Sequence, residues 1–506
     1  MTLHPGTIAA ATPERIAVIV DDATLTYAAL DRQSRAIAAA LFALGLRRGD
    51  VLAMLIGNRP DFFSVAWAAQ RSGLYYLPIP TRLTPPEIAY LLSDSGAKAF
   101  AVDPDYRDIA EAGAAGTSAR LIGITAIEKS APEPPAVEGA DMLYTSGSTG
   151  EPKGVRRPIT GMPLGSDVSR VERAKKLFGL TSGSVFFSPA PLYHAAPLRF
   201  TMNLLRTGGT VIATRRFDAR GALETIAAHR VTHSQWVPTM FVRMLALDDA
   251  DRSAFDLSSH RVAIHGAAPC PPDIKRGMIK WWGPILHEYY SGTESIGFTH
   301  ATSAEWLAKP GTVGRSYGST VHILDDEGDE LPPGQTGTIY FEGSARLSYH
   351  NDIEKTAGAH SKNGWVTMGD IGHVDDDGYL FLTDRRAFTI ISGGINIYPA
   401  EVEAAFVGHP DIADVAVFGV PDADLGEATF ALIELHPDVP RDAIIAGRLY
   451  AHARKTLAAF KLPRRIAFGD VGRTETGKLH KPQLKAKYGD GRIGFEMARE
   501  QLEAAA

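Results

Sequence analysis

The sequence predicts an α/β protein, with a large N-terminal domain of layered α/β subdomains and a β-rich subdomain, followed by a small α+β C-terminal domain. Three observations support this. At 506 residues the chain is too long for a single core. Apolar strand-like runs alternate with helical patterns up to about residue 320, and short strands around Gly and Pro turns follow. We place the domains at residues 1–384 and 385–506.

The first segments show the alternation clearly. Thr26 is a typical N-cap, apolar residues recur at helical spacing after it, and Gly45 ends the pattern, which predicts an amphipathic helix. Further strands and helices are then expected in turn: a strand at 51–56, a helix after Pro60, a strand at 75–79, a helix after Pro85 and a strand at 97–102. Such alternation favours parallel strands, whose ligands bind at their carboxyl ends.

The later segments complete the predicted fold. Buried strands are expected at 186–189, 208–212 and 262–269. Hairpin strands are expected at 321–324 and 338–341, and Asp377-Gly378 is a turn between two more. The C-terminal domain should have strands at 415–420 and 429–435 and a long helix with one apolar face, formed by Ile445, Leu449, Ala453 and Leu457.

Composition limits the function classes. A net charge of −6 and a pI near 6.3 give no case for nucleic-acid binding. A single cysteine, Cys270, excludes an internal disulfide framework and a Cys-based zinc site. The longest uncharged apolar run, 36–46, is too short to span a bilayer, and the chain opens without a signal-peptide pattern. We therefore expect a cytoplasmic protein without a transmembrane segment; the oligomeric state stays open, a homodimer included.

The segment Tyr144-Thr-Ser-Gly-Ser-Thr-Gly-Glu-Pro-Lys-Gly154 follows the apolar Met142-Leu143. Glycines let backbone amides turn inward, hydroxyls add donors, and a lysine supplies positive charge, which suits a polyphosphate. A flexible Gly/Ser linker is the alternative, and the ordered Pro-Lys-Gly ending argues against it. The nucleotide-binding residues predicted here are Thr145, Ser146, Gly147, Ser148, Thr149, Gly150 and Lys153.

This segment closely resembles the phosphate-binding signature of the adenylate-forming superfamily, which contains acyl-CoA synthetases, peptide adenylation domains and beetle luciferases. The resemblance extends from about Leu25 to Leu484 and is closest in pattern to AMP-forming fatty-acyl or aryl-CoA ligases. It implies a two-step reaction: Mg-ATP and a carboxylic acid give an acyl-adenylate and pyrophosphate, and CoA then takes the acyl group as a thioester. It also implies ATP, Mg²⁺ and CoA as cofactors, and a C-terminal domain that rotates between the steps.

The resemblance assigns further roles in the nucleotide site. Thr293 matches the α-phosphate contact, and Glu294 matches the carboxylate that helps to hold Mg²⁺. These positions suit the chemistry, because an anionic acid must approach an anionic polyphosphate. Met368 stands where the family commonly has Thr. The adenine and ribose positions implied by the resemblance are Gly266, Ala267, Ala268, Pro269, Tyr290, Asp370 and Arg385.

The C-terminal domain carries the matching catalytic lysine, Lys478, which implies a bridge between the substrate carboxylate and the α-phosphate during adenylation. Gly393 and Gly394 match the loop that lets pantetheine pass in the second step. His194 resembles the histidine near the acyl pocket and the thioester tunnel. The hinge position, often charged in the family, is Ala387, which puts a charged hinge in doubt.

The substrate is predicted to be an apolar carboxylic acid: fatty, aryl or alicyclic. Amino-acid-activating relatives keep an acidic residue near His194, whereas residues 191–200 contain no Asp or Glu. The acyl pocket is assigned to Trp236, Val237, Ala195, Ile296 and Gly297. Two alternatives remain: an acyl-AMP ligase that loads a carrier protein, and a non-catalytic nucleotide-binding relative, which would be expected to lack Lys478 or Glu294.

Residues 441–465 are strongly basic within an acidic protein. This stretch contains seven Lys and Arg residues and a single acidic residue, Asp442. A solvated helix face would look the same. Because CoA carries three phosphates, we expect part of this stretch to bind its nucleotide end. The basic positions are 441, 448, 454, 455, 461, 464 and 465.

Overall fold

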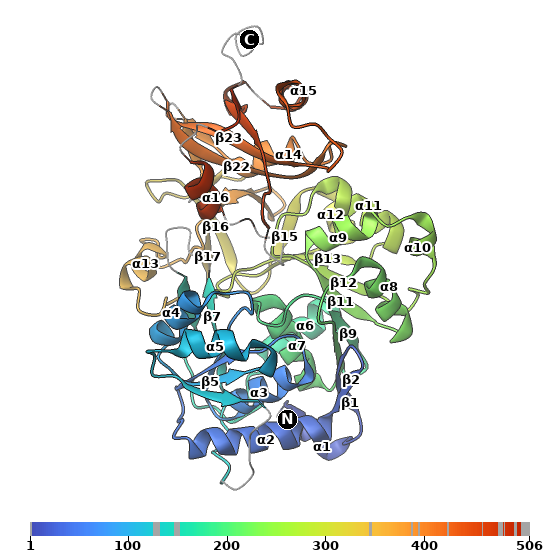
Figure 1. Cartoon of the computed structure of the whole chain (residues 1–506), viewed down its shortest axis with the longest axis vertical. Coiled ribbons are helices and arrows are strands. Elements are labelled where there is room, and N and C mark those ends of the chain that lie inside the picture. The colour runs from blue at the N-terminus through green and yellow to red at the C-terminus, as the bar shows by residue number, and fades with distance from the viewer. Residues whose placement is uncertain are drawn as a thin grey trace.

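The computed structural model describes the chain apart from residues 1–2, 125–131, 146–151, 344–346, 386–387, 393–394, 423–424, 458, 474–478, 480, 490–492 and 497–506. It describes the backbone only for Thr145, Asp384, Arg385, Ile391, Ile395, Asn396, Pro482 and Glu496. The C-terminal domain lies at one end of the long axis, and α1 (Pro5–Ala11) and α2 (Tyr27–Ala43) lie at the other (Figure 1). No helix of the described chain is long and apolar enough to cross a membrane.

The first sheet has the strand order β6-β5-β3-β4-β7-β8 and is parallel except for β8. Thr26 caps α2 through its side chain, and the expected strand at 97–102 has those bounds. The strands are β3 (Val51–Leu55), β4 (Tyr75–Pro78), β5 (Ala97–Val102), β6 (Arg120–Gly123), β7 (Ala140–Thr145) and β8 (Lys153–Arg156). The helices after α2 are α3 (Pro60–Arg71), α4 (Pro85–Ser95), η1 (Pro104–Tyr106) and α5 (Arg107–Ala114).

The second sheet joins 13 strands of the described chain. One part is mainly parallel: β1 (Ile16–Val20), β2 (Ala23–Thr26), β9 (Val185–Ser188), β10 (Thr210–Ala213), β11 (His233–Trp236), β12 (Val262–His265) and β13 (Leu286–Tyr290). Its helices are α6 (Ser169–Phe178), α7 (Ala195–Thr207), α8 (Ala219–Ala228), α9 (Pro238–Leu245), α10 (Asp249–Ser253), α11 (Pro272–Trp282) and α12 (Ser303–Ala308). Strand β2 is one edge of this sheet, and both β1 and β2 begin before Leu25, where the sequence pattern was expected to begin.

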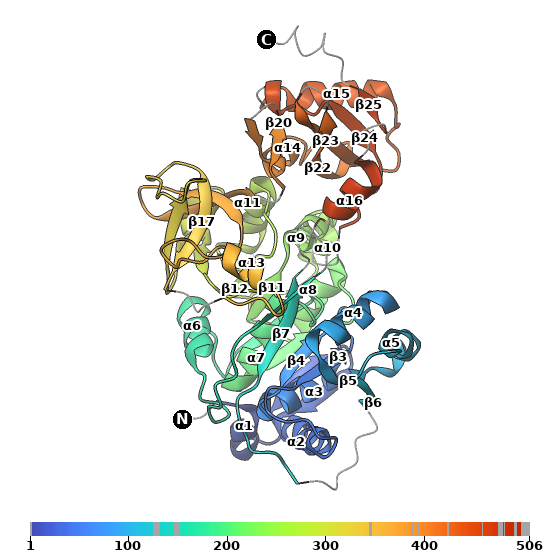
Figure 2. The same cartoon turned by 90° about the vertical axis from the view of Figure 1, so that its left-hand side faces the viewer.

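The β-rich subdomain continues the same sheet through antiparallel pairs. Its strands are β14 (Thr299–Thr302), β15 (Thr312–Ser316), β16 (Thr320–Leu324), β17 (Gly337–Glu342), β18 (Asp370–Val374) and β19 (Tyr379–Arg385), with α13 (Ile353–Gly358) beside them. Figure 2 shows this subdomain to one side of the parallel strands. The hairpins expected near 321, 338 and 377 are present, but they extend the parallel sheet.

Apolar packing produces the layers. The largest core lies between the two sheets and contains residues of α3, α7, β3 and β9, such as Phe62, Leu198, Leu52 and Phe186. A second core covers the other face of the large sheet under α8, α9 and α11, and a third lies under α4 and α5. The layered α/β class predicted from the sequence is confirmed.

The C-terminal domain has its own sheet and core, with Ile390, Val417 and Leu449 fully or nearly fully buried. Its strands are β20 (Ile390–Ser392), β21 (Ile395–Ile397), β22 (Ile412–Asp422), β23 (Gly426–Leu435), β24 (Arg465–Phe468) and β25 (Phe495–Glu496). Its helices are α14 (Pro399–Ala404), α15 (Ala443–Ala453), η3 (Ala459–Lys461) and α16 (Lys481–Tyr488). The division at 384/385 falls inside β19 and remains a prediction.

Candidate active site

The predicted phosphate loop closes a hairpin at the edge of the first sheet. Cα of Thr145 in β7 pairs with Lys153 in β8, so the two ends of the loop meet. Lys153 Nζ lies 3.3 Å from Asp352 Oδ2, which keeps this cation beside a carboxylate. The loop residues Ser146, Gly147, Ser148, Thr149 and Gly150 lie outside the described part of the chain.

Helix α4 supports both sides of this hairpin. Tyr90 Oη donates a hydrogen bond of 3.0 Å to the carbonyl of Pro152, and Tyr144 Oη donates one of 2.6 Å to Asp94 Oδ2. Burial, followed by the bond to Asp94, raises the pKa of Tyr144 well above its usual range. The Tyr144 phenol therefore remains neutral and acts as a donor.

The predicted adenine segment follows β12. A Cβ at Gly266 would lie 2.8 Å from the Tyr289 carbonyl oxygen and ring, so only glycine fits against the neighbouring strand. Ala267 has a φ of +72°, which few non-glycine residues adopt, and it turns the chain away from the sheet before Pro269. Because β12 and β13 are parallel neighbours, this segment and Tyr290 leave the sheet at the same edge.

Tyr290, Asp370 and Arg385 meet, although they are far apart in the sequence. Tyr290 Oη donates a hydrogen bond of 2.5 Å to Asp370 Oδ2. Asp370 begins β18 and is directly paired in register with Arg385, the last residue of β19. Tyr290 and the two positions expected to hold the ribose therefore form one group.

Thr293 and Glu294 are the central residues of a turn, closed by a 3.1 Å hydrogen bond from the Ser295 amide to the Gly292 carbonyl. Tyr349 Oη donates a hydrogen bond of 3.0 Å to Glu294 Oε1. A Cβ at Gly292 would lie 2.2 Å from Met368 Sδ, so the unusual methionine packs directly against the turn.

A third side chain holds this turn. Arg199 of α7 donates from Nη2 to the Thr293 carbonyl at 2.9 Å and from Nη1 to Ser295 Oγ at 3.0 Å. The sequence analysis missed both Arg199 and Tyr349. An arginine in an amphipathic helix looks like a solvated residue, and the tyrosine belongs to no predicted motif.

The described residues contain no group of three or more His, Cys, Asp and Glu able to hold a metal ion. Glu294 presents one partly buried carboxylate oxygen acceptor, supported by Tyr349. A single carboxylate suits Mg²⁺, which keeps several waters and binds phosphate oxygens. The turn therefore fits the magnesium expected with ATP.

His194 is the N-cap residue of α7, and its ring lies 4.8 Å from that of Tyr193. Ala195 begins the helix and is half-buried. Both precede Arg199 by little more than one turn of α7. This helix therefore connects the predicted acyl region to the Thr293 turn.

The other residues assigned to the acyl pocket have core neighbours. Trp236 is fully buried against Phe187 and Phe241, and Val237 is the buried N-cap of α9. Ile296 is buried in the β-rich subdomain, and a Cβ at Gly297 would lie 2.3 Å from the ring of Phe341. Their role in an acyl pocket remains a prediction.

Several predicted functional positions of the C-terminal domain, Lys478, Gly393, Gly394 and Ala387, lie outside the described residues. Arg473, just before the lysine segment, bonds Asp414 through Nε at 2.5 Å and Nη2 at 2.8 Å. Helix α16, which begins shortly after Lys478, lies on the side of its domain that faces the N-terminal domain (Figures 1 and 2). The chain on both sides of the lysine is therefore fixed to this domain.

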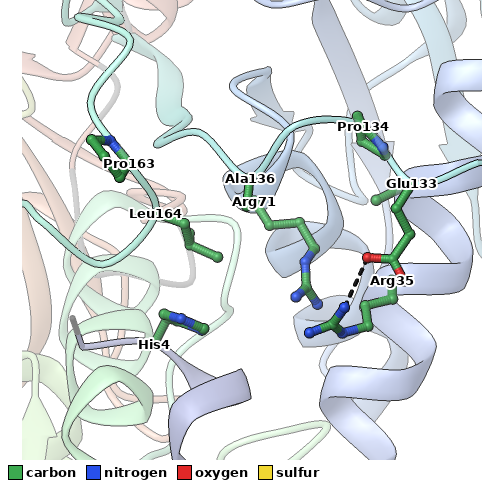
Figure 3. Close-up of a pocket in the computed structure, with 9 residues that line it drawn as sticks. His4, Arg35, Arg71, Glu133, Pro134, Ala136, Pro163 and Leu164 are labelled. Atoms are coloured by element: carbon green, nitrogen blue, oxygen red, sulfur yellow. Dashed lines mark hydrogen bonds and ion pairs between the residues drawn. The ribbon is translucent and has the colours of Figure 1, made fainter.

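A pocket of about 300 Å³ lies away from these residues, near α1 and α2 (Figure 3). Its charged groups are paired: Arg35 with Asp31 and Glu133, and Arg71 with Asp31. Burial is the main reason that the pKa of His4 is lowered. The pocket contains none of the predicted site residues.

Comparisons with known proteins identify the family of the chain. The family model described as "AMP-binding enzyme" matches residues 7–348, and "AMP-binding enzyme C-terminal domain" matches residues 401–478. The chain belongs to the AMP-binding enzyme family. The adenylate-forming resemblance found in the motifs is thereby confirmed.

Two curated relatives and one solved enzyme illustrate the likeness. A feruloyl-CoA synthase of Amycolatopsis sp is 35% identical over 94% of this chain and 96% of its own length. The long-chain-fatty-acid--CoA ligase FadD13 of Mycobacterium tuberculosis is 31% identical over 92% and 94%. The o-succinylbenzoate CoA synthetase of Bacillus subtilis, solved with its acyl-adenylate intermediate, is 29% identical, with a TM-score of 0.84 over 98% and 99%. This AMP-binding enzyme is an acid–thiol ligase of the acyl-CoA synthetase type.

Proposed function

We propose that this AMP-binding enzyme activates an apolar carboxylic acid with Mg-ATP and transfers the acyl group to CoA. The observation that carries the proposal is the convergence of the Tyr290–Asp370 pair and the Thr293–Glu294 turn at the carboxyl end of β13, next to that of the parallel strand β12. Relatives named for aromatic and long-chain acids support an apolar substrate. We also propose a cytoplasmic location.

In the first step, the adenine would lie between the Gly266 segment and the Tyr290 ring, and Asp370 and Arg385 would hold the ribose. Thr293 would bind the α-phosphate, and Glu294 would be a ligand of Mg²⁺, which neutralises charge on the phosphates when bound. Lys153 would exchange its carboxylate partner for the polyphosphate. Attack of the substrate carboxylate on the α-phosphorus then forms the acyl-adenylate and releases pyrophosphate.

Lys478 would stabilise the negative charge that develops around the α-phosphate and the entering carboxylate. In the second step, the C-terminal domain would withdraw Lys478 and bring Gly393 and Gly394 to the pantetheine path. The thiolate of CoA attacks the acyl carbon, and AMP leaves. His194 at the start of α7 would lie beside this acyl group.

The test is incubation with Mg-ATP and a panel of fatty, aryl, alicyclic and amino acids, with and without CoA, followed by mass spectrometry. Acyl-CoA together with AMP from an apolar acid is the expected result. Acyl-adenylate that accumulates whether or not CoA is present would instead identify a ligase that loads a carrier protein. Absence of AMP and of acyl products with every acid would contradict the proposal.

A further inference from the structure

The Thr293–Glu294 turn is connected to the phosphate-loop hairpin through one arginine. Arg199 donates from Nη2 and Nε to Asp141 Oδ2, at 2.6 and 2.9 Å, while it also bonds the Thr293 carbonyl and Ser295 Oγ. Asp141 lies in β7, four residues before Thr145. One guanidinium therefore joins the strand that enters the phosphate loop to the turn expected at the α-phosphate.

The connection is electrostatically strong. Asp141 is buried, with only 2% of its side chain exposed, and Arg157 and Arg170 also lie within 3.3 and 3.7 Å of its Oδ1. Burial alone would raise the pKa of Asp141, but Arg199, Arg157 and Arg170 hold that pKa well below its usual range. This carboxylate is therefore a fixed negative charge that holds the Arg199 guanidinium in place.

The turn itself needs support. Ser295 has a φ of +56°, a region that costs a non-glycine residue about 1–3 kcal/mol and persists only where neighbours enforce it. The hydrogen bond from Arg199 Nη1 to Ser295 Oγ holds the Ser295 side chain and so helps to keep its backbone in this conformation. A lysine could contact one of these partners, but it lacks the planar set of donors needed to reach Asp141, Thr293 and Ser295 together.

We propose that Arg199, fixed by Asp141, is a positioning residue for adenylation: it sets the Thr293–Glu294 turn relative to the phosphate loop. This inference rests on the proposed function, because it takes Thr293 as the α-phosphate contact. Arg199 acts on the nucleotide through the turn. A misplacement of about 1 Å in such a contact can lower a rate about 100-fold without loss of the fold.

The test compares Arg199→Lys, Arg199→Met and the control Arg157→Met. Among the described residues, Arg157 bonds Asp141 and Asp167 through its side chain but does not bond the turn. We expect the single-turnover rate of acyl-adenylate formation to fall about 10-fold in Arg199→Lys and about 100-fold in Arg199→Met, with KM for ATP changed less than about threefold. Arg157→Met should stay within about twofold of the unaltered enzyme.

A double-mutant cycle separates positioning from general packing. If Arg199 acts through Thr293, combining Arg199→Met with Thr293→Ala should cost little more than the larger single loss. Losses that multiply, or an equal loss in Arg157→Met, would overturn the inference. So would an Arg199→Met enzyme that adenylates within twofold of the unaltered protein.

Hydrogen–deuterium exchange gives a measurement that needs no substrate. Amides of residues 292–297 should exchange faster in Arg199→Met and Arg199→Lys, whereas Arg157→Met leaves them unchanged. Unchanged exchange in the Arg199 variants would overturn the inference even if the enzyme is active. Faster exchange confined to those variants would support it even if no acid in the panel is activated, which would count against the proposed function alone.

Discussion

Asp370 receives a 2.5 Å hydrogen bond from Tyr290 and is paired through the backbone with Arg385, so one carboxylate links the ends of three strands of the large sheet. The residue is 7% exposed, and its carboxylate is the predicted acceptor for both ribose hydroxyls. Its loss should therefore affect nucleotide use more than loss of the tyrosine hydroxyl.

We expect Asp370→Ala to lower kcat/KM for ATP about 10- to 100-fold, as removal of a hydrogen bond to a charged group does. Tyr290→Phe retains the ring and should cost less than about fivefold. Steady-state kinetics with ATP as the varied substrate checks both variants. Equal losses in the two would show that the carboxylate acts only through the tyrosine.

Lys478→Ala should lower acyl-adenylate formation by at least about 100-fold, because the charge that stabilises the transition state is removed. Transfer from supplied acyl-adenylate to CoA should remain within about threefold. Quenched-flow measurements of each half-reaction provide the check. If both steps fell equally in a folded variant, the assignment of the lysine to adenylation alone would be wrong.

Lys275 of α11 and Glu288 of β13 form a buried ion pair of 2.5 Å. Burial lowers the pKa of Lys275 and raises that of Glu288, against the attraction between them. Lys275→Met leaves the carboxylate unpaired and should destabilise the N-terminal domain by about 3–5 kcal/mol.

The matched variant Lys275→Met/Glu288→Leu should recover most of that stability, because no buried charge remains. Urea unfolding followed by tryptophan fluorescence measures the difference, and Trp306 lies 4.7 Å from the lysine Nζ. A double variant as unstable as the single one would indicate that packing, and not charge, sets the cost.

Stability should also fall as the pH is lowered from about 6.5 to 4. Burial is the main cause that lowers the pKa of His233 and His287 to about 4 and that of His260 to about 3. The unfolded chain then binds protons that the folded one does not, so the free energy of unfolding rises with pH through this window and levels off above 6.5.

Each such histidine contributes a slope of up to about 1.4 kcal/mol per pH unit. Denaturant titrations at several pH values would measure it, and His260→Gln should remove about one proton from the difference. A flat stability between pH 4 and 6.5 would contradict this prediction.

Several basic residues of the stretch 441–465 form ion pairs with carboxylates of the C-terminal domain, which lowers the positive charge available to a ligand. Arg448, Lys461 and Arg464 bond Asp411, Glu401 and Asp422. Arg454 and Lys455, at the end of α15, are exposed and have no such bond in the described structure.

We therefore expect Arg454→Glu/Lys455→Glu to raise KM for CoA about 10-fold and to leave adenylation unchanged, with a weaker effect at high salt. Kinetics with CoA as the varied substrate provides the measurement. Arg441→Glu, a charge reversal before α15, is the control. The same rise in the control would show a general charge effect.

The fold was largely predictable because its signals are local. Thr26 caps a helix formed by the residues that directly follow it. The strand at 97–102 begins and ends where its apolar run does. The hairpin β20–β21 was missed because residues 392–399 resemble a loop. The continuity of the two sheet regions depends on the pairing of β13 with β14, which no local pattern specifies.

Site residues could be predicted where they belong to a recognisable motif, and the other site residues could not. Arg199 bonds Asp141, 58 residues earlier in the chain, and neither belongs to a motif identified in the sequence. One signal was present: Asp141 is a charged residue in the otherwise apolar run before the phosphate loop. A charge at such a buried position requires a partner, and only the fold identifies it.

The pairing of Asp370 with Arg385 has a mechanical consequence. The backbone leaves the large sheet at Arg385, beside the ribose position, and β20 of the next domain begins at Ile390. If the C-terminal domain turns about this exit, the distance that any of its atoms travels grows with its separation from the axis. Contacts to the ribose would lie close to the axis and would persist during the rotation. Residues of the C-terminal domain far from the axis would leave the site and others would replace them. The bound nucleotide would then stay close to the rotation axis, while the acyl-adenylate would face first the residues for adenylation and then those for thioester formation.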